Sequence, residues 1–142
     1  MIAWAAGFDD HFVDDWYALR DVFKAHKARI TFFVANYGDL GPARIAKLHK
    51  LAADGHAIEA HGMGHRDAAQ DVDQHGLSAY LAVEIDPLLK AMNADGFHPT
   101  TFAYPFGSRT AELDNALLQR FQLLRSLTYT DKSLINSAPC PR

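Results

Sequence analysis

Two acidic residues and two histidines stand at spacings that could hold a metal ion. Asp9 and Asp10 are adjacent, and His61 and His65 are four residues apart in the run AHGMGH. A carboxylate with two neutral imidazoles suits zinc or a similar divalent ion, and a neighbouring carboxylate could act as a general base. Each pair also has an ordinary interpretation, because aspartate is common in turns and helix caps, and a histidine pair in a loop can simply be solvated.

Two further features lie near these candidates. His56 begins the strand before the histidine pair, and the apolar Ile58 two residues on favours a core or strand-edge histidine bonded to the backbone over a third ligand. The run FAYPFG, residues 102–107, has no side chain suited to proton transfer. Its contribution to chemistry would be a backbone N–H, for instance that of Phe106, directed at a developing oxyanion. A plain Pro-aromatic-Gly turn explains the run equally well.

Short apolar runs alternate with amphipathic stretches, which is the pattern of repeated βα units. Pro42 suits the first position of a helix, Gly55 suits the position just past its end, and Pro87 should kink the helix that contains it. The class predicted is α/β with about five parallel strands. Strands are expected at residues 1–8 (a buried one), 28–35, 56–60, 100–105 and 122–129, and helices at residues 14–27, 43–54, 78–94 and about 109–121.

The candidate residues all follow predicted strands directly. In parallel α/β folds the carboxyl ends of the strands converge on one edge, where binding and catalytic sites are built. Asp9 and Asp10, the histidine pair and the YPFG turn are therefore expected to meet in space. This placement makes Asp10, His61 and His65 candidate metal ligands, and it makes Asp9 the candidate base.

The composition is that of an ordinary globular domain. The chain has 142 residues, 49% hydrophobic and 22% charged, with a net charge of -3, so no basic surface for nucleic acid is expected. We expect one domain over residues 1–130 and a tail or linker over 131–142. The single cysteine, Cys140, excludes an intrachain disulfide and a cysteine-rich zinc site. No apolar run is long enough to span a membrane, and the compartment stays open: cytoplasmic, or secreted with a signal removed.

Four segments in sequence resemble the polysaccharide deacetylase family, carbohydrate esterase family four. GFDD at 7–10 is similar to the family's Thr-Phe-Asp-Asp motif, and GHAIEAHGMGH at 55–65 is similar to its Gly-His-Glu-Ile-x-x-His-Ser/Thr-x-x-His motif. ARITFFV at 28–34 resembles the Ala-Thr-Phe-Phe-Val strand, and FAYPFG resembles the Arg-x-Pro-Tyr motif without its arginine. Order and spacing agree over residues 7–107.

The resemblance implies a partial or distorted (β/α) barrel that binds one divalent metal ion, usually zinc, at its strand ends. Asp10, His61 and His65 match the family's metal triad, Asp9 matches its catalytic base, and Phe106 matches the residue whose backbone N–H helps to hold the oxyanion. The implied reaction removes acetyl groups from N-acetylated sugars: metal-bound water, activated by Asp9, attacks an acetamide carbonyl.

The departures from the family pattern keep two alternatives open. Ala103 stands where the family has an arginine that braces the base, a role that Arg109 or Arg125 could take. The later motifs, including the Leu-x-His that supplies the general acid, have no match, so the chain resembles the first five strands of a longer barrel. The alternatives are a related metal-dependent amide hydrolase that opens cyclic amides, and a metal- or glycan-binding module without turnover. An exposed sheet edge would also favour a homo-oligomer that covers it.

Overall fold

The computed structural model describes residues 6–127. The expected tail at 131–142, the first residues of the expected first strand and the end of the fifth lie outside the described residues. Strands and helices alternate as predicted: β1 (Ala6–Asp10), α1 (Val13–Ala18), α2 (Arg20–Ala25), β2 (Ile30–Val34), a 3-10 turn η1 (Tyr37–Asp39), α3 (Pro42–Ala53), β3 (Ala57–Ala60), α4 (Ala68–His75), α5 (Leu77–Tyr80), a π-helical turn η2 (Leu81–Ile85), α6 (Asp86–Ala94), β4 (Thr101–Ala103), a 3-10 turn η3 (Pro105–Gly107), α7 (Ala111–Leu117) and β5 (Leu123–Arg125).

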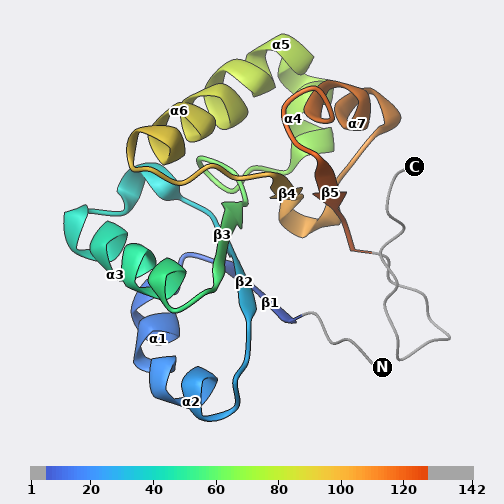
Figure 1. Cartoon of the computed structure of the whole chain (residues 1–142). Helices are drawn as coiled ribbons and strands as arrows, with labels where there is room; N and C mark the ends of the chain where they lie inside the picture. Colours follow the sequence, from blue (N-terminus) through green and yellow to red (C-terminus); the bar gives the residue numbers. More distant parts are fainter. Residues whose placement is uncertain (1–5, 128–142) are drawn as a thin grey trace, which may run out of the picture.

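The five strands form one parallel sheet in the order β1-β2-β3-β4-β5. The sheet is curled into a half-barrel, and the helices lie around its outer side (Figure 1). This arrangement confirms the predicted α/β class and the partial (β/α) barrel. Since the strands run in sequence order and all in one direction, their carboxyl ends form a single rim.

The two faces of β2 show how the sheet is packed. Ile30, Phe32 and Val34 belong to the hydrophobic core beneath the helices. Thr31 and Phe33, which point the other way in the period-two alternation of a strand, line a cavity of about 370 Å³ on the inner face of the half-barrel. The sheet therefore has an apolar outer layer and a hollow inner face.

The first strand differs from the expectation. It was predicted to be buried and to end before the acidic pair, but β1 includes both aspartates, and Ala6, Gly7 and Phe8 are exposed. Among the described residues β1 pairs only with β2, so it forms an edge of the sheet. Apolar residues on an edge strand are covered on one side at most, and a hydrophobic run does not reveal whether its strand is central or peripheral.

The helices also differ in detail. Residues 68–75 form a helix, α4, which the pattern of apolar residues does not predict. The helix expected at 78–94 is widened into a π turn at Leu81–Ile85, which ends two residues before Pro87. Proline has no N–H to donate to the carbonyl four residues earlier, and a π turn is one of the irregularities that accommodate such a defect in a helix. No helix within residues 6–127 is long and apolar enough to cross a membrane.

Candidate metal centre and active site

Three of the predicted residues meet at the carboxyl rim of the sheet. Asp10, His61 and His65 each offer one ligand atom, and these atoms lie within 4.8 Å of one another. His65 Nε2 is 3.0 Å from Asp10 Oδ1, and His61 Nε2 is 3.8 Å from the same oxygen. The parallel sheet thus brings together groups that are far apart in the sequence.

The backbone at this rim is shaped to direct the side chains inward. Asp10 ends β1 with a φ of 85°, and its carbonyl accepts a hydrogen bond from Ala35 N–H at 2.8 Å. His61 follows β3 directly, with its N–H donating to Val34 O at 3.1 Å. His65 has a φ of 56°. Left-handed backbone costs a residue other than glycine on the order of 1–3 kcal/mol, so the surrounding contacts must hold it.

One hydrogen bond fixes the ring of His61. Its Nδ1 lies 2.8 Å from the carbonyl oxygen of Ala103, and the side chain is only 3% exposed. We assign the proton to Nδ1, because a carbonyl oxygen can only accept, and this leaves the Nε2 lone pair facing Asp10. Burial lowers the pKa of His61 below its usual range, although the hydrogen bond to Ala103 opposes this effect. A neutral imidazole with its second nitrogen bound to a backbone carbonyl is the arrangement typical of metal-ligating histidines.

The donor set fits a divalent cation. One carboxylate oxygen and two imidazole nitrogens match the ligands that zinc and neighbouring transition metals prefer. The site is only partly closed, since the side chain of Asp10 is 39% exposed and that of His65 is 23% exposed. The group could therefore hold an ion and still admit a substrate from solvent.

Asp9 is directed elsewhere than Asp10. It shares the inner face of the half-barrel with Gly7, and its carboxylate forms an ion pair with Arg125 of β5. The guanidinium carbon of Arg125 also lies 4.6 Å from the centroid of the Phe33 ring. The ion pair spans the inner face between the first and the last described strands. The adjacent aspartates thus differ in their ion-pair partners. Asp10 lies near both histidines, whereas Asp9 pairs with an arginine, although its charge also acts to raise the pKa of His61.

The same contact decides which arginine stands near the candidate base. The sequence left Arg109 and Arg125 as candidates to replace the arginine absent at Ala103. Arg109 pairs with Asp114, a carboxylate that also accepts from the buried Tyr104 hydroxyl at 2.9 Å. Arg125 alone of the two contacts Asp9.

Phe106 lies beside the cluster. It occupies the 3-10 turn after β4 with a φ of 58°, and its ring is 4.8 Å from that of His65 in an edge-on orientation. Its side chain is 63% exposed. The turn expected from the FAYPFG run is therefore present, next to a candidate ligand.

His56 is not part of this group. Its Nδ1 accepts a hydrogen bond from Ile30 N–H at 3.1 Å, and its ring packs edge-on against Phe23 and Phe32. This confirms the core interpretation made from the sequence.

Glu84 is a residue of the site that the sequence reading missed. It is 1% exposed, and its carboxylate accepts from the backbone N–H groups of Gly64 and Arg66, on either side of His65. A signal was present, because Glu84 stands four residues from Tyr80 and four from Leu88 on an otherwise apolar helical stripe. An acidic residue at such a position must find partners inside the fold.

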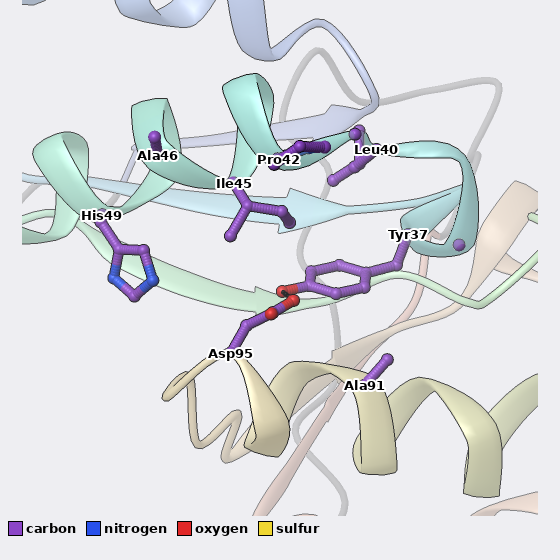
Figure 2. Close-up of a pocket in the computed structure, with 10 residues that line it drawn as sticks. Tyr37, Leu40, Pro42, Ile45, Ala46, His49, Ala91 and Asp95 are labelled. Atoms are coloured by element: carbon purple, nitrogen blue, oxygen red, sulfur yellow. Dashed lines mark hydrogen bonds between the residues drawn. The ribbon is translucent and has the colours of Figure 1, made fainter.

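A cavity of about 530 Å³ lies away from this chemistry, between α3 and α6. Figure 2 shows the side chain of Tyr37 between the two helices, with its hydroxyl directed at Asp95. Tyr37 donates to that carboxylate at 2.9 Å, and Ile45 and His49 of α3 line the opposite wall. None of the predicted site residues lines this cavity.

The comparisons with known proteins agree with the fold. The family model described as polysaccharide deacetylase matches residues 2–122. A comparison with curated proteins gave no match. Among solved structures, the chitin deacetylase of the fungus Colletotrichum lindemuthianum is 24% identical with a TM-score of 0.66, over 84% of this chain and 53% of that chain.

Two bacterial structures are also similar. A family 4 carbohydrate esterase from Streptomyces lividans, solved with acetate, is 18% identical with a TM-score of 0.72, over 87% of this chain and 62% of that chain. The catalytic domain of a peptidoglycan N-acetylglucosamine deacetylase from Eubacterium rectale is 19% identical with a TM-score of 0.68, over 94% and 64%. The chain thus spans between 53% and 64% of the length of these three proteins. At these identities the likeness shows the fold. The match of the family model over most of the sequence shows more: the chain belongs to the polysaccharide deacetylase family.

Proposed function

We propose that this chain carries the metal-binding and base-bearing part of a deacetylase that removes acetyl groups from N-acetylated sugars. The observation that carries the proposal is the placement of four side chains at the rim. The candidate ligand atoms of Asp10, His61 and His65 lie within 4.8 Å of one another, and the adjacent Asp9 pairs with Arg125. Metal-assisted hydrolysis of an amide uses a cation-binding group together with a general base, and the side chains at this rim are suited to both roles.

The residues divide the work as follows. Asp10, His61 and His65 would hold one divalent ion, for which zinc is our first choice. When bound, such an ion polarises a carbonyl oxygen and lowers the pKa of water. Asp9 accepts the proton of the attacking water, and Arg125 keeps the Asp9 carboxylate on the inner face and away from Asp10. The backbone N–H of Phe106 donates to the oxyanion that forms on the acetyl carbon.

Two other functions remain candidates on specific grounds. The first is a metal-dependent hydrolase of cyclic amides, since the same groups would serve any amide carbonyl. The second is a metal- or glycan-binding module without turnover. The motif that would supply a general acid to the leaving amine has no match in this sequence.

Acetate release tests the proposal. The chain is loaded with zinc or cobalt and incubated with chito-oligosaccharides, and free acetate is measured beside the Asp9→Asn variant. We expect release that depends on the metal and falls in the variant. Hydrolysis of a cyclic ureide or imide without acetate release would favour the first alternative. Sugar binding without any hydrolysis would favour the second, and failure to bind metal at all would remove the basis of all three.

A further inference from the structure

Glu84 is a buried carboxylate for which the proposed chemistry gives no role. It lies in the π turn between α5 and α6 and is 1% exposed. Its neighbours on the same stripe, Tyr80 and Leu88, are fully buried apolar residues of the core. Burying a carboxylate is costly unless hydrogen bonds compensate, so its partners identify what it is there to hold.

Those partners all belong to the loop at residues 62–66, which contains the candidate ligand His65. The Glu84 carboxylate accepts from Gly64 N–H at 2.9 Å and from Arg66 N–H at 3.0 Å. The Glu84 backbone carbonyl accepts from Met63 N–H at 3.2 Å. The Arg66 side chain adds a charge contact at 3.7 Å from its Nε. One residue of the π turn thus binds three amides of a loop that is close to it only in space.

His65 stands between the two amides that the carboxylate holds. Its φ of 56° is unfavourable, and the hydrogen bonds at Gly64 and Arg66 fix the chain on either side of it. Its ring reaches Asp10 at 3.0 Å. Without these two hydrogen bonds the loop could relax to an ordinary φ, which would turn the ring away from Asp10.

The loop has glycine at the two positions where a side chain would come too close to the Glu84 carboxylate. Gly62 has a φ of 99°, and a Cβ added there would collide with Glu84 Oε1. A Cβ added at Gly64 would lie 3.3 Å from Glu84 Oε2, tighter than a comfortable contact. The Gly-Met-Gly run between the histidines therefore leaves room for the carboxylate.

We propose that Glu84 is a positioning residue for the metal site, which sets the conformation of the 62–66 loop and thereby the direction of the His65 imidazole. The inference rests on the proposed function for the metal site itself. It assigns to Glu84 no contact with substrate. A role in folding alone would leave metal affinity unaffected in a variant that still folds.

A matched pair of substitutions separates the two roles. Glu84→Gln keeps the shape but replaces one acceptor oxygen with an amide group that faces an N–H donor. Glu59→Gln makes the same chemical change elsewhere, since the Glu59 carboxylate accepts from Thr100 N–H at 2.8 Å and Thr101 N–H at 2.7 Å, where β3 meets β4. Both variants should unfold at a lower temperature than the wild type.

Metal affinity is measured by calorimetric titration of the metal-free chain with zinc. We expect Glu84→Gln to weaken binding by roughly 10- to 100-fold, the usual effect of losing support behind a ligand, and Glu59→Gln to leave it unchanged. Equal affinity in Glu84→Gln and wild type would overturn the inference, as would an equal loss in both variants. If the wild type binds no zinc, the failure belongs to the proposed function.

A second measurement needs no metal. In the metal-free protein, hydrogen exchange at the Gly64 and Arg66 amides should be faster in Glu84→Gln than in wild type, with the amides of β2 unaffected. Unchanged exchange at both amides would show that Glu84 does not hold the loop.

If Glu84→Gln does not fold, the same contact can be tested by substituting a glycine of the loop. Gly62→Ala places a methyl group against the Glu84 carboxylate, whereas Gly76→Ala introduces a similar backbone strain, at a φ of 87°, with no atom within 4 Å. We expect weakened zinc binding in Gly62→Ala only. Wild-type affinity in Gly62→Ala would overturn the inference.

Discussion

The two ends of the parallel sheet are built in different ways. At the carboxyl rim Asp10, Asn36, His65 and Phe106 all have positive φ, although none is glycine. Within residues 6–127, Lys27 is the one other non-glycine residue with this backbone. Such conformations are unfavourable. Four of them together indicate that the rim is less stable than an unstrained backbone would be, and that this strain serves to orient side chains.

The amino end carries ordinary stabilising contacts instead. Arg20 pairs with Asp54 at 2.5 Å, and Lys24 lies 3.4 Å from the same carboxylate. His56 satisfies the N–H of Ile30, the first residue of β2. The comparison indicates that the carboxyl end of the sheet is built for chemistry and the amino end for stability. Substitutions at the rim should change metal binding or rate with little effect on folding, and substitutions at the amino end should do the reverse.

The largest effect is expected for Asp10→Asn. Asparagine tolerates left-handed backbone, so the fold should persist, but the charged ligand is lost. We expect zinc affinity to fall by roughly 100-fold or more, beyond what loss of a supporting residue gives, and acetate release to disappear with it. Metal analysis after gel filtration measures the first and an acetate assay the second. A full equivalent of zinc retained by the variant would contradict the assignment.

Asp9→Asn should show whether the two adjacent aspartates have different roles. Loss of a general base lowers the rate by roughly 10²- to 10⁴-fold, while zinc affinity stays at the wild-type value. Steady-state rates at saturating substrate, with metal content determined on the same sample, make the comparison. Should Asp9→Asn lose its metal as Asp10→Asn does, the two carboxylates would not have separate roles.

Arg125→Gln should have a smaller effect on rate. Asp9 keeps its charge but loses the partner that fixes its position, and we expect kcat to fall about tenfold, or ~1.4 kcal/mol in the barrier. Arg109→Gln is the matched control, because Arg109 pairs with Asp114 and not with Asp9. Its kcat should equal that of the wild type. Equal losses in the two variants would argue against a specific role for Arg125.

The smallest effect on chemistry is expected at the amino end, from His56→Phe. Phenylalanine fills the space between Phe23 and Phe32 but leaves Ile30 N–H without its acceptor, at a cost of about 1–3 kcal/mol in the free energy of unfolding. Zinc affinity should not change. Urea unfolding of the metal-free protein measures the loss, and a weakened metal site in this variant would break the division between the two ends.

The same variant tests a pH dependence. Burial lowers the pKa of His56 below its usual value of 6.5, because the charged ring loses its hydration, and the neutral ring accepts from Ile30 N–H. With the folded-state pKa below the unfolded one, the stability that His56 contributes is present above pH 6.5 and is lost as the pH falls through the folded-state pKa. The stability difference between wild type and His56→Phe should therefore shrink from about pH 7.5 to about pH 5.5. A difference that grows on acidification would contradict this sign.

The fold was largely predictable because its signals are local. The period of apolar residues located four helices and five strands, and Pro42 and Gly55 marked the two ends of α3 correctly. One error came from a non-local cause, because the apolar residues of β1 did not reveal that it lies at an edge of the sheet. The π turn near Pro87 was not predicted, since a proline does not reveal how the preceding helical turn accommodates it.

The candidate ligands of the site could be predicted from the sequence, but the residues that support them could not. The strand ends of a parallel fold were sufficient to predict that Asp10, His61 and His65 meet, as they do. The apolar stripe around Glu84 indicated that it is buried but not what it binds, because its partners are backbone amides, which carry no mark in the sequence.

The sequence by itself determined the α/β class, the positions of the three ligand candidates and the core role of His56, since each follows from periodicity or from spacing next to a strand. Tertiary structure alone decided which arginine meets Asp9 and which carboxylate holds the histidine loop. Arg125 lies 116 residues from Asp9, and Glu84 lies 18 to 20 residues from the amides it binds. The physical reason is that hydrogen bonds and ion pairs depend on distance in space, which the curl of the sheet and the packing of the π turn set only after the chain has folded.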